Sequence, residues 1–269
     1  MDVTQVRADL IAEQAALDEI VAPLSADQLT LPTPSPRWTV ADQIAHLTYF
    51  DGNAALAIED PDAFKGTVHA LLEAAVGGEE AIDEFTLGAW RRLPSAELVA
   101  AWRANRDHLA ATSSTLANDT RIEWYGPSMG SKSFLTARLM EVWAHGQDII
   151  DTVGAVRPPT DRIRHIAQLG YITRKWSYIN RGMEAPEGDV AVVLTAPSGA
   201  EWTWGDDADN RVTGPAEDFC LVVTQRRHVD DTALSVTGDR ARDWLVRAQA
   251  FAGPATDGPT AGADRGGND

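Results

Sequence analysis

Two histidines and one glutamate in this sequence are spaced as metal ligands carried by helices. Glu141 and His145 lie four residues apart in the segment RLMEVWAHGQDII, which has the hydrophobic spacing of a helix. Because residues i and i+4 share one helix face, the carboxylate and the imidazole point the same way. His46 lies in a second helical segment, WTVADQIAHL. Two histidines and one carboxylate leave open positions on a divalent ion, so we expect a catalytic metal site if the three meet in space.

The carboxylate of Glu141 needs a compensating partner if it is buried. Burying an unpaired carboxylate costs several kcal/mol, and Glu141 shares its helix face with apolar residues. A metal ion is one partner that would compensate the charge, and an ion pair with Arg138, three residues earlier, is another. Asp148 could accept the imidazole N–H of His145, or it could serve only as a cap or ion-pair acid. Tyr49 could face the same cavity as His46, or it could be a half-buried bundle residue.

The other histidines and the single cysteine favour structural roles. His69, His108, His165 and His228 have no partner at ligand spacing, and Cys220 lies in the apolar segment DFCLVV. One cysteine allows no intramolecular disulfide and no cysteine-based zinc site, which fits a reducing compartment. The sequence contains no nucleophile elbow and no phosphate-binding glycine loop of the required form.

Length and charge bound the class of protein. The chain has 269 residues, 44% of them hydrophobic, and a formal net charge of −17. This charge argues against nucleic acid and against anionic membrane surfaces as partners. The first residues form no signal peptide, and no segment approaches the roughly 20 apolar residues of a membrane span. We therefore expect a cytoplasmic protein that acts on small molecules, while the oligomeric state is left open.

Hydrophobic periodicity predicts a four-helix bundle over residues 1–156. Thr39 and Asp42 form a capping-box pattern before one helix, and Gly154 stands where a helix-ending glycine is expected. The segment TRIEWYGPSMG predicts a loop. The predicted helices span 2–24, 39–60, 66–92 with a break at Gly77-Gly78, 95–116 and 131–153.

After the segment Arg157-Pro158-Pro159 the pattern changes to that of a small α+β domain over residues 157–252. The β-branched segment VAVVLTAP and the alternating segment AEWTWGDD predict a β-hairpin. The tail, residues 253–269, is rich in Gly, Pro and Asp and is predicted to be disordered. The fold class is therefore mainly α with a small α+β C-terminal domain. The other elements predicted for the C-terminal domain are helices over 161–179, 215–228 and 239–251, and a strand over 233–236.

Two segments together resemble a known family. WTVADQIAHL and ARLMEVWAHGQDII are similar to the signature segments of DinB-like metal-binding bundles and, more narrowly, of the mycothiol-dependent maleylpyruvate isomerase family. The resemblance covers roughly residues 5–155. The segments GPAEDFCLVVTQRR and TGDRARDWL resemble the C-terminal domain of that family more weakly. The resemblance implies a DinB-like four-helix bundle followed by an α/β cap domain.

The resemblance also implies a chemistry. It implies a zinc-type divalent ion held by His46, Glu141 and His145, with mycothiol as the thiol cosubstrate. The catalytic arginine of the family follows a Thr-Gly pattern, which reads Thr224-Gln225-Arg226 here, so Arg226 is the candidate and Arg227 is its neighbour. A thiol bound to the ion would lose its proton and attack a small electrophile, giving isomerisation or S-transfer.

Two other functions use the same three residues. A metal-dependent hydrolase would need a general base, for which Asp148 or Asp42 are the candidates. A non-catalytic metal-binding module would usually have four protein ligands, and no fourth ligand is evident in the sequence. The ligand set does not identify the metal, because it also suits Fe²⁺ and Ni²⁺.

Overall fold

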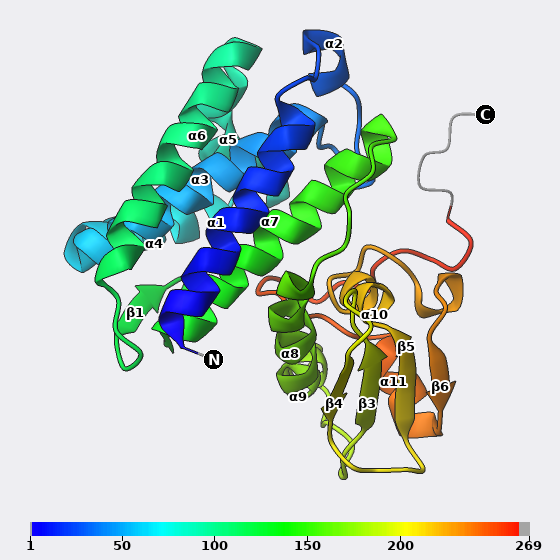
Figure 1. Cartoon of the computed structure of the whole chain (residues 1–269). Helices are drawn as coiled ribbons and strands as arrows, with labels where there is room; N and C mark the ends of the chain where they lie inside the picture. The colour runs from blue at the N-terminus through cyan, green and yellow to red at the C-terminus, as the bar shows by residue number, and fades with distance from the viewer. Residues whose placement is uncertain (1, 264–269) are drawn as a thin grey trace. The chain divides into compact units, whose positions relative to one another are not determined.

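The computed structural model describes residues 2–263, which form two compact units that divide between Arg157 and Pro158. Unit 1 is helical except for one short hairpin, and unit 2 combines a sheet with helices (Figure 1). The predicted fold class, mainly α with a small α+β part at the C-terminal end, is confirmed.

Four long helices of unit 1 pack side by side as a bundle (Figure 1). Each buries an apolar stripe at the i, i+3 and i+4 spacing of an amphipathic helix. In α1 the buried stripe includes Val6, Leu10, Leu17 and Val21. The bundle consists of α1 (Val3–Val21), α3 (Val40–Glu59), α6 (Ser95–Thr112) and α7 (Ser131–Val153), and it is flanked by α2 (Ala26–Leu29), α4 (Pro61–Ala75), α5 (Glu79–Arg91) and the 3₁₀-helix η1 (Ser113–Thr115).

The ends of the two helices that carry the predicted ligands follow local sequence rules. At the start of α3 the hydroxyl of Thr39 accepts from the backbone N–H of Asp42, and the Asp42 carboxylate accepts from the N–H of Thr39, so the capping box is confirmed. Helix α7 ends at Gly154, whose φ of 65° lies in the left-handed region that glycine tolerates best. The start of α3 and the end of α7 are therefore set by local sequence.

Two predictions for unit 1 are wrong. The segment predicted as a loop is an antiparallel hairpin of β1 (Arg121–Trp124) and β2 (Gly126–Gly130), and Trp124 stacks on Phe64 of α4 with ring centroids 5.4 Å apart. The helix predicted from residue 66 begins at Pro61, because Asp60 caps it by accepting from the N–H of Ala63. The two strands pair with each other, and the stacking of Trp124 on Phe64 packs the hairpin against α4.

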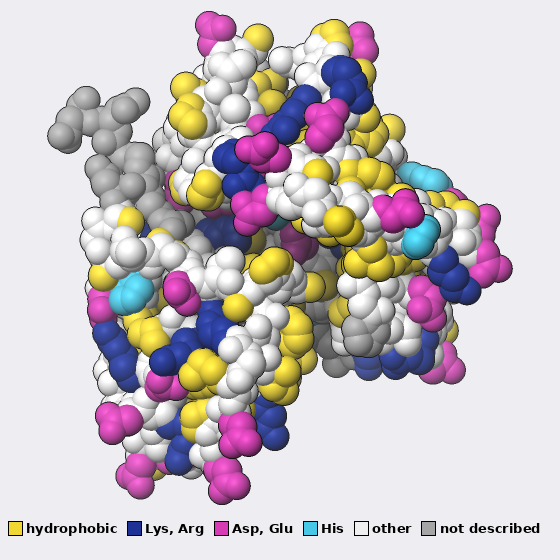
Figure 2. Space-filling model, turned by 180° about the vertical axis from the view of Figure 1, so that it is seen from behind, with side chains coloured by type: hydrophobic (Ala, Val, Ile, Leu, Met, Phe, Trp, Pro, Cys, Tyr) yellow, Lys and Arg dark blue, Asp and Glu magenta, His cyan; other side chains and the backbone are white. Residues whose placement is uncertain are grey.

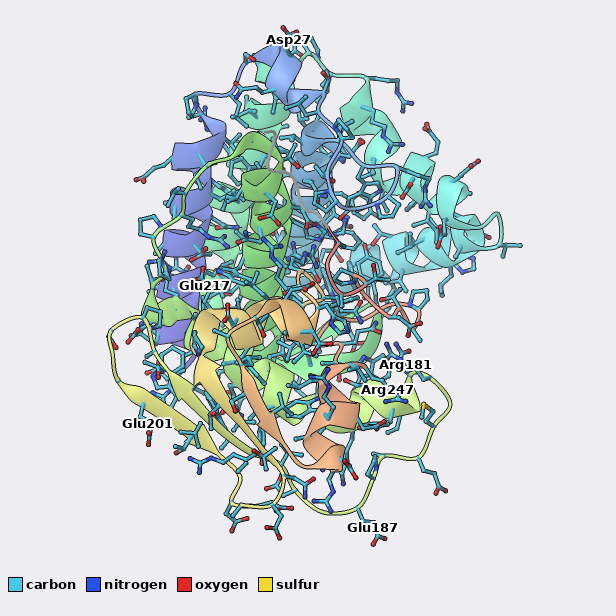
Figure 3. The ribbon with its side chains drawn as sticks, turned by 90° about the vertical axis from the view of Figure 1, so that its right-hand side faces the viewer. Asp27, Arg181, Glu187, Glu201, Glu217 and Arg247 are labelled. Carbon is cyan, nitrogen blue, oxygen red and sulfur yellow. The ribbon has the colours of Figure 1, made fainter. Side chains whose placement is uncertain are left out.

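Unit 2 is a four-stranded sheet with the order β4-β3-β5-β6. The predicted hairpin is confirmed as antiparallel β3 and β4, whereas β5, which pairs parallel to β3, was not predicted. Glu187 and Glu201 are exposed and point away from the sheet (Figure 3). The elements are η2 (Asp161–Ile163), α8 (Arg164–Ile172), α9 (Arg174–Ile179), β3 (Ala191–Thr195), β4 (Glu201–Trp204), β5 (Arg211–Pro215), α10 (Ala216–Val223), η3 (Val229–Asp231), β6 (Ser235–Thr237) and α11 (Asp239–Leu245).

The segment after residue 252 has no helix or strand as far as residue 263. The hydroxyl of Thr256 lies 2.5 Å from Oε1 of Gln225, and the N–H of Gly262 donates to the carboxylate of Asp231. Residues 264–269, which complete the tail predicted to be disordered, lie outside the described part of the chain.

Acidic side chains are spread over the face of the molecule seen in Figure 2, as the net charge of −17 leads one to expect. Within residues 2–263, no helix combines the length and the apolar character needed to cross a bilayer.

A buried ion pair ties three bundle helices together. The guanidinium of Arg138 on α7 donates to Oδ1 of Asp51 on α3, at 3.0 Å from Nη2 and 3.2 Å from Nε. Gln14 of α1 donates to the other oxygen of the same carboxylate at 3.0 Å. The side chains of Arg138 and Asp51 are only 4% and 0% exposed, so neither charge has water as an alternative partner.

Replacing Arg138 by Leu should therefore lower the free energy of unfolding by about 3–5 kcal/mol, because Asp51 is left buried without its cation. Urea denaturation of the metal-free protein measures this loss. The double variant Arg138→Leu with Asp51→Leu should recover much of it. A loss below about 1 kcal/mol, as expected for the exposed pair of Arg92 and Glu84, would contradict this interpretation.

Candidate metal centre

Helices α3 and α7 bring the three predicted ligands into one group. Nε2 of His46 lies 3.2 Å from Oε2 of Glu141, and Nε2 of His145 lies 3.1 Å from the same oxygen. The two imidazole centroids are 4.2 Å apart. One ligand atom from each residue lies within 4.8 Å of the others. The three side chains therefore meet in space as the sequence predicted, and their role as metal ligands stays a prediction.

Aromatic rings surround the two imidazoles. The indole of Trp38 stacks on His145 with centroids 5.8 Å apart and lies 5.1 Å from His46, while Phe50 lies 4.5 Å from His46. The side chains of His46, Glu141 and His145 are 14%, 22% and 13% exposed. This apolar wall limits access of water, so electrostatic interactions at the group are stronger than in solvent.

The pKa values of His46 and Glu141 are shifted toward the protonation states that bind a cation. Burial and, to a smaller extent, the charge of His145 together lower the pKa of His46 from 6.5 to about 3, although Glu141 acts in the opposite direction. Burial alone would raise the pKa of Glu141, but hydrogen bonds and charge from His145 and His46 outweigh burial and hold it well below its ordinary value. Metal ligation requires a neutral imidazole and an ionised carboxylate, which His46 and Glu141 supply.

The structure removes the simplest alternative to a metal at Glu141. Arg138 was the other candidate partner, and it is bound to Asp51 instead. Among the described residues, the recorded hydrogen bonds of Glu141 go to the two imidazoles. Two imidazole nitrogens and one carboxylate oxygen in contact form a donor set that suits a divalent cation.

Gln43, rather than Asp148, contacts the second ring nitrogen of His145. Oε1 of Gln43 lies 2.6 Å from Nδ1, whereas Asp148 accepts a hydrogen bond from the hydroxyl of Ser35 at 3.0 Å. Sequence reasoning did not identify Gln43. The position of Gln43 could have identified it. It lies three residues before His46 on an apolar helix face, where a buried amide needs a hydrogen-bond partner.

Asp42, the other acid considered as a general base, belongs to the capping box of α3. Its carboxylate also accepts from Nε of Arg91 at 2.7 Å. This pairing ties α3 to α5 and leaves Asp42 engaged in structure.

Tyr49 is half-buried and pairs with a second tyrosine. The hydroxyl of Tyr125 lies 3.4 Å from that of Tyr49, and burial raises the pKa of both phenols. The ring of Tyr125 also packs edge-on against Phe50 at 5.5 Å. Because the hairpin was predicted as a loop, the aromatic residues that it adds beside the group could not be foreseen.

The remaining histidines lie outside this group. His69, His108 and His228 each lie beside an acidic side chain, namely Glu73, Glu59 and Asp230, and His165 is buried in α8. Cys220 is buried, and burial raises the pKa of its thiol well above the ordinary value. Across residues 2–263, one group of three His, Cys, Asp or Glu side chains is close enough to share an ion, and it consists of His46, Glu141 and His145.

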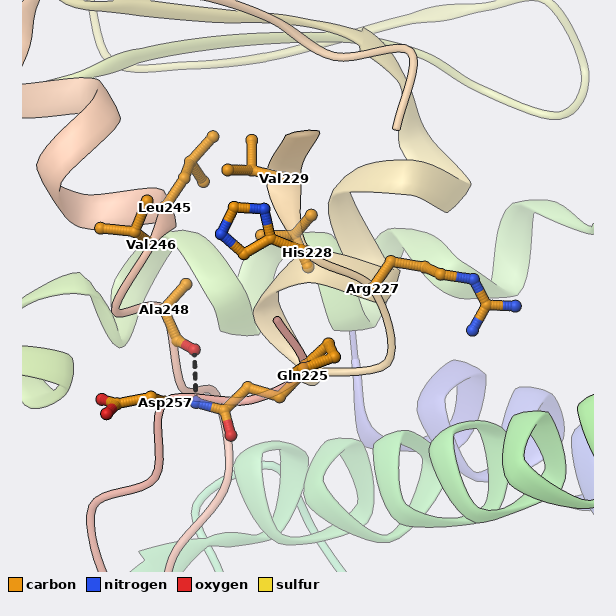
Figure 4. Close-up of a pocket in the computed structure, with 10 residues that line it drawn as sticks. Gln225, Arg227, His228, Val229, Leu245, Val246, Ala248 and Asp257 are labelled. Atoms are coloured by element: carbon orange, nitrogen blue, oxygen red, sulfur yellow. Dashed lines mark hydrogen bonds between the residues drawn. The ribbon is translucent and has the colours of Figure 1, made fainter. Parts of the chain in front are cut away.

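Arg226, the predicted catalytic arginine, belongs to unit 2 and lies three residues after the end of α10 at Val223. Its Nη1 donates to the backbone carbonyl of Thr224 at 2.8 Å. Gln225 has a φ of 59°, and its amide donates to the carbonyl of Ala248 at 3.1 Å (Figure 4). The same amide donates to the carbonyl of Thr256 at 2.7 Å, so the turn that carries Arg226 is held by the tail segment.

Comparisons with known proteins agree on one family. The model of the mycothiol maleylpyruvate isomerase N-terminal domain matches residues 10–150, and that of the corresponding C-terminal domain matches residues 173–242. Two uncharacterized proteins of Mycobacterium tuberculosis, one from each of two strains, are 42% identical over 248 residues, which is 92% of this chain and 95% of each relative.

Two solved structures share the fold. They are the mycothiol-dependent maleylpyruvate isomerase and a histidine-to-alanine mutant of it. They are 17% and 16% identical to this chain, both with a TM-score of 0.57, and each comparison covers 87% of this chain and 93% of the solved one.

The lowered pKa of His46 predicts how acid affects the metal-free protein. The unfolded chain takes up a proton near pH 6.5, whereas folded His46 takes it up only near pH 3, so this contribution to stability is complete above 6.5 and is lost as the pH falls. Replacing His46 by Phe should reduce the loss between pH 6.5 and about pH 5 by roughly 1–2 kcal/mol. Urea denaturation at a series of pH values measures it, and superimposable pH profiles would contradict the prediction.

Proposed function

Because the chain belongs to the mycothiol maleylpyruvate isomerase family, we propose that it is an enzyme that activates mycothiol with a divalent metal ion, with Zn²⁺ as the first candidate. The thiol would add to a small electrophilic substrate, and the reaction would be an isomerisation or an S-transfer. The observation that carries the proposal is the convergence of His46, Glu141 and His145 within 4.8 Å of one another.

A divalent ion held by these three residues would supply a Lewis acid that stabilises the thiolate form of a bound thiol. The residues of the chain provide the conditions for this. His46 and Glu141 offer a lone pair and a negative charge without first losing a proton, because their pKa values are lowered. Trp38 and Phe50 cover the imidazoles and limit the water that would solvate a nucleophile.

The alternatives receive less support from the geometry. A structural ion would usually have four protein ligands, and within the described part of the chain the group offers three. A hydrolase would need a free general base, but Asp42 is bound to Arg91 and Asp148 accepts from Ser35. Catalysis with an exogenous ligand in an open position is therefore the function that the site supports best.

We assign the substrate-binding role to Arg226 on the backbone conformation beside it. The family pattern has glycine where this chain has Gln225, and the φ of 59° at Gln225 is one that glycine adopts most readily. This supports the correspondence of Arg226 with the arginine of the family. Its planar guanidinium suits bidentate binding of a substrate carboxylate.

Metal content and thiol binding test the proposal together. Protein purified without added metal should contain about one equivalent of a divalent ion, and His145→Ala should abolish it, whereas His108→Ala on the protein surface should not. Addition of mycothiol to the Co²⁺-substituted protein should produce a thiolate-to-metal charge-transfer band. Stoichiometric metal in His145→Ala would refute the ligand assignment, and metal binding without that band would refute the role of the thiol.

Arg226→Gln should lower kcat/KM by roughly 100-fold or more with maleylpyruvate and mycothiol, the first substrate pair to assay, because a charged hydrogen-bond pair to the carboxylate is lost. Its metal content should equal that of the wild type. Arg227→Gln is the neighbouring control and should change kcat/KM far less. Equal losses in the two variants, or a loss confined to Arg227→Gln, would overturn the assignment.

A further inference from the structure

Gln43 is fully buried, and both ends of its amide are engaged beside the metal centre. Oε1 lies 2.6 Å from Nδ1 of His145, and Nε2 donates to the hydroxyl of Thr33 at 2.9 Å. That hydroxyl in turn lies 2.9 Å from the backbone carbonyl of Trp38. Thr33 and Trp38 belong to the proline-rich connector, residues 30–39, which joins α2 to α3. This connector is therefore hydrogen-bonded to Gln43, which contacts His145.

The direction of each hydrogen bond in this chain follows from the one before it. A carbonyl can only accept, so the single hydroxyl proton of Thr33 goes to the carbonyl of Trp38. The hydroxyl oxygen must then accept from Nε2 of Gln43, which turns Oε1 of the amide toward His145. Oε1 can only accept, so Nδ1 of His145 carries the proton.

A neutral imidazole has one N–H, so a proton on Nδ1 leaves a lone pair on Nε2. Nε2 of His145 lies 3.1 Å from Oε2 of Glu141, which is also an acceptor. The orientation of Gln43 therefore places the lone pair of neutral His145 on Nε2, beside Oε2 of Glu141, where a metal ion would be bound by both atoms.

We propose that Gln43, oriented by Thr33, is a positioning residue that fixes the tautomer of His145 and thereby makes Nε2 the metal ligand. The inference rests on the metal site of the proposed function and adds a residue to it. Hydrogen bonds of this kind orient ligating imidazoles and raise their affinity for the ion.

The amide of Gln43, where a glutamate would place a carboxylate, affects the net charge of the proposed site. The three ligands carry a formal charge of −1, and the neutral Gln43 adds none, so a divalent ion would leave a net charge of +1. That charge attracts an anionic ligand such as a thiolate, which a glutamate in the same place would oppose.

The test is the Zn²⁺ affinity of the full-length protein, measured by competition with a chromophoric chelator. Gln43→Leu should weaken binding about 10–100-fold, because the imidazole loses the acceptor that orients it. Gln43→Glu keeps an acceptor at the same place and should bind at least as tightly as the wild type. Thr33→Val removes only the hydroxyl that orients the amide and should weaken binding by a smaller factor.

Two buried residues of the bundle provide matched controls. Gln14→Leu removes a buried amide that contacts Asp51, and Thr48→Val removes a buried hydroxyl that donates to the carbonyl of Ile44. Gln14→Leu should lower thermal stability as much as Gln43→Leu, and Thr48→Val as much as Thr33→Val. In both controls the Zn²⁺ affinity should stay at the wild-type value.

The outcomes separate this inference from the proposed function. Wild-type affinity in folded Gln43→Leu and Thr33→Val, or an equal loss of affinity in the Gln14 and Gln43 variants, would overturn the role of Gln43 and leave the metal site standing. Failure of the wild type itself to bind Zn²⁺ or another divalent ion would overturn the proposed function and, with it, this role.

Discussion

The largely buried carboxylate of Glu141 is the constraint on which the candidate metal centre depends. It contacts the imidazoles of His46 on α3 and of His145 on α7, and its side chain is 22% exposed. A carboxylate in such a place is costly unless positive charge or several hydrogen bonds compensate it. Both contacts fall on one oxygen, Oε2, so the imidazoles and the carboxylate converge on a single point rather than surrounding the charge.

The charges inside the bundle are divided between two neighbouring places. Arg138 and Gln14 satisfy Asp51, which is fully buried, and this pairing holds α1, α3 and α7 together. Glu141, one helical turn after Arg138, is left with His46 and His145. The cation nearest to Glu141 in the sequence is thus bound to Asp51, and the contacts of Glu141 are to the two imidazoles. The pairing of Arg138 with Asp51 thereby leaves the proposed ligand group without a neighbouring arginine bound to its carboxylate.

Polar contacts from irregular segments outside the helices hold side chains at or beside the proposed site residues. The proline-rich connector supplies Thr33 to Gln43 and places the ring of Trp38 over both imidazoles. In unit 2 the segment after residue 252 plays a comparable role for the turn at Gln225, whose left-handed backbone costs about 1 kcal/mol in a residue other than glycine. In both places hydrogen bonds from irregular chain fix a side chain, Gln43 or Gln225, next to a residue of the proposed site.

Local signals in the sequence were sufficient for features that form within one helix. Thr39 and Asp42 predicted the start of α3, Gly154 predicted the end of α7, and the spacing of Glu141 and His145 placed them on one face. Capping and the i, i+4 relation depend only on residues within about a turn, so they can be read from adjacent positions. The resemblance of two segments to a family supported grouping His46, on a different helix, with these two residues, which spacing alone could not do.

Tertiary structure decided which partners those side chains have. The pairing of Arg138 with Asp51 instead of Glu141, and of His145 with Gln43 instead of Asp148, depends on how α3 and α7 are rotated against each other. The hairpin at residues 121–130 and strand β5 depend likewise on neighbours distant in sequence. Sequence determines which groups a helix face presents, whereas the packing of one helix on another determines which groups meet, because contacts across helices join positions with no fixed spacing along the chain.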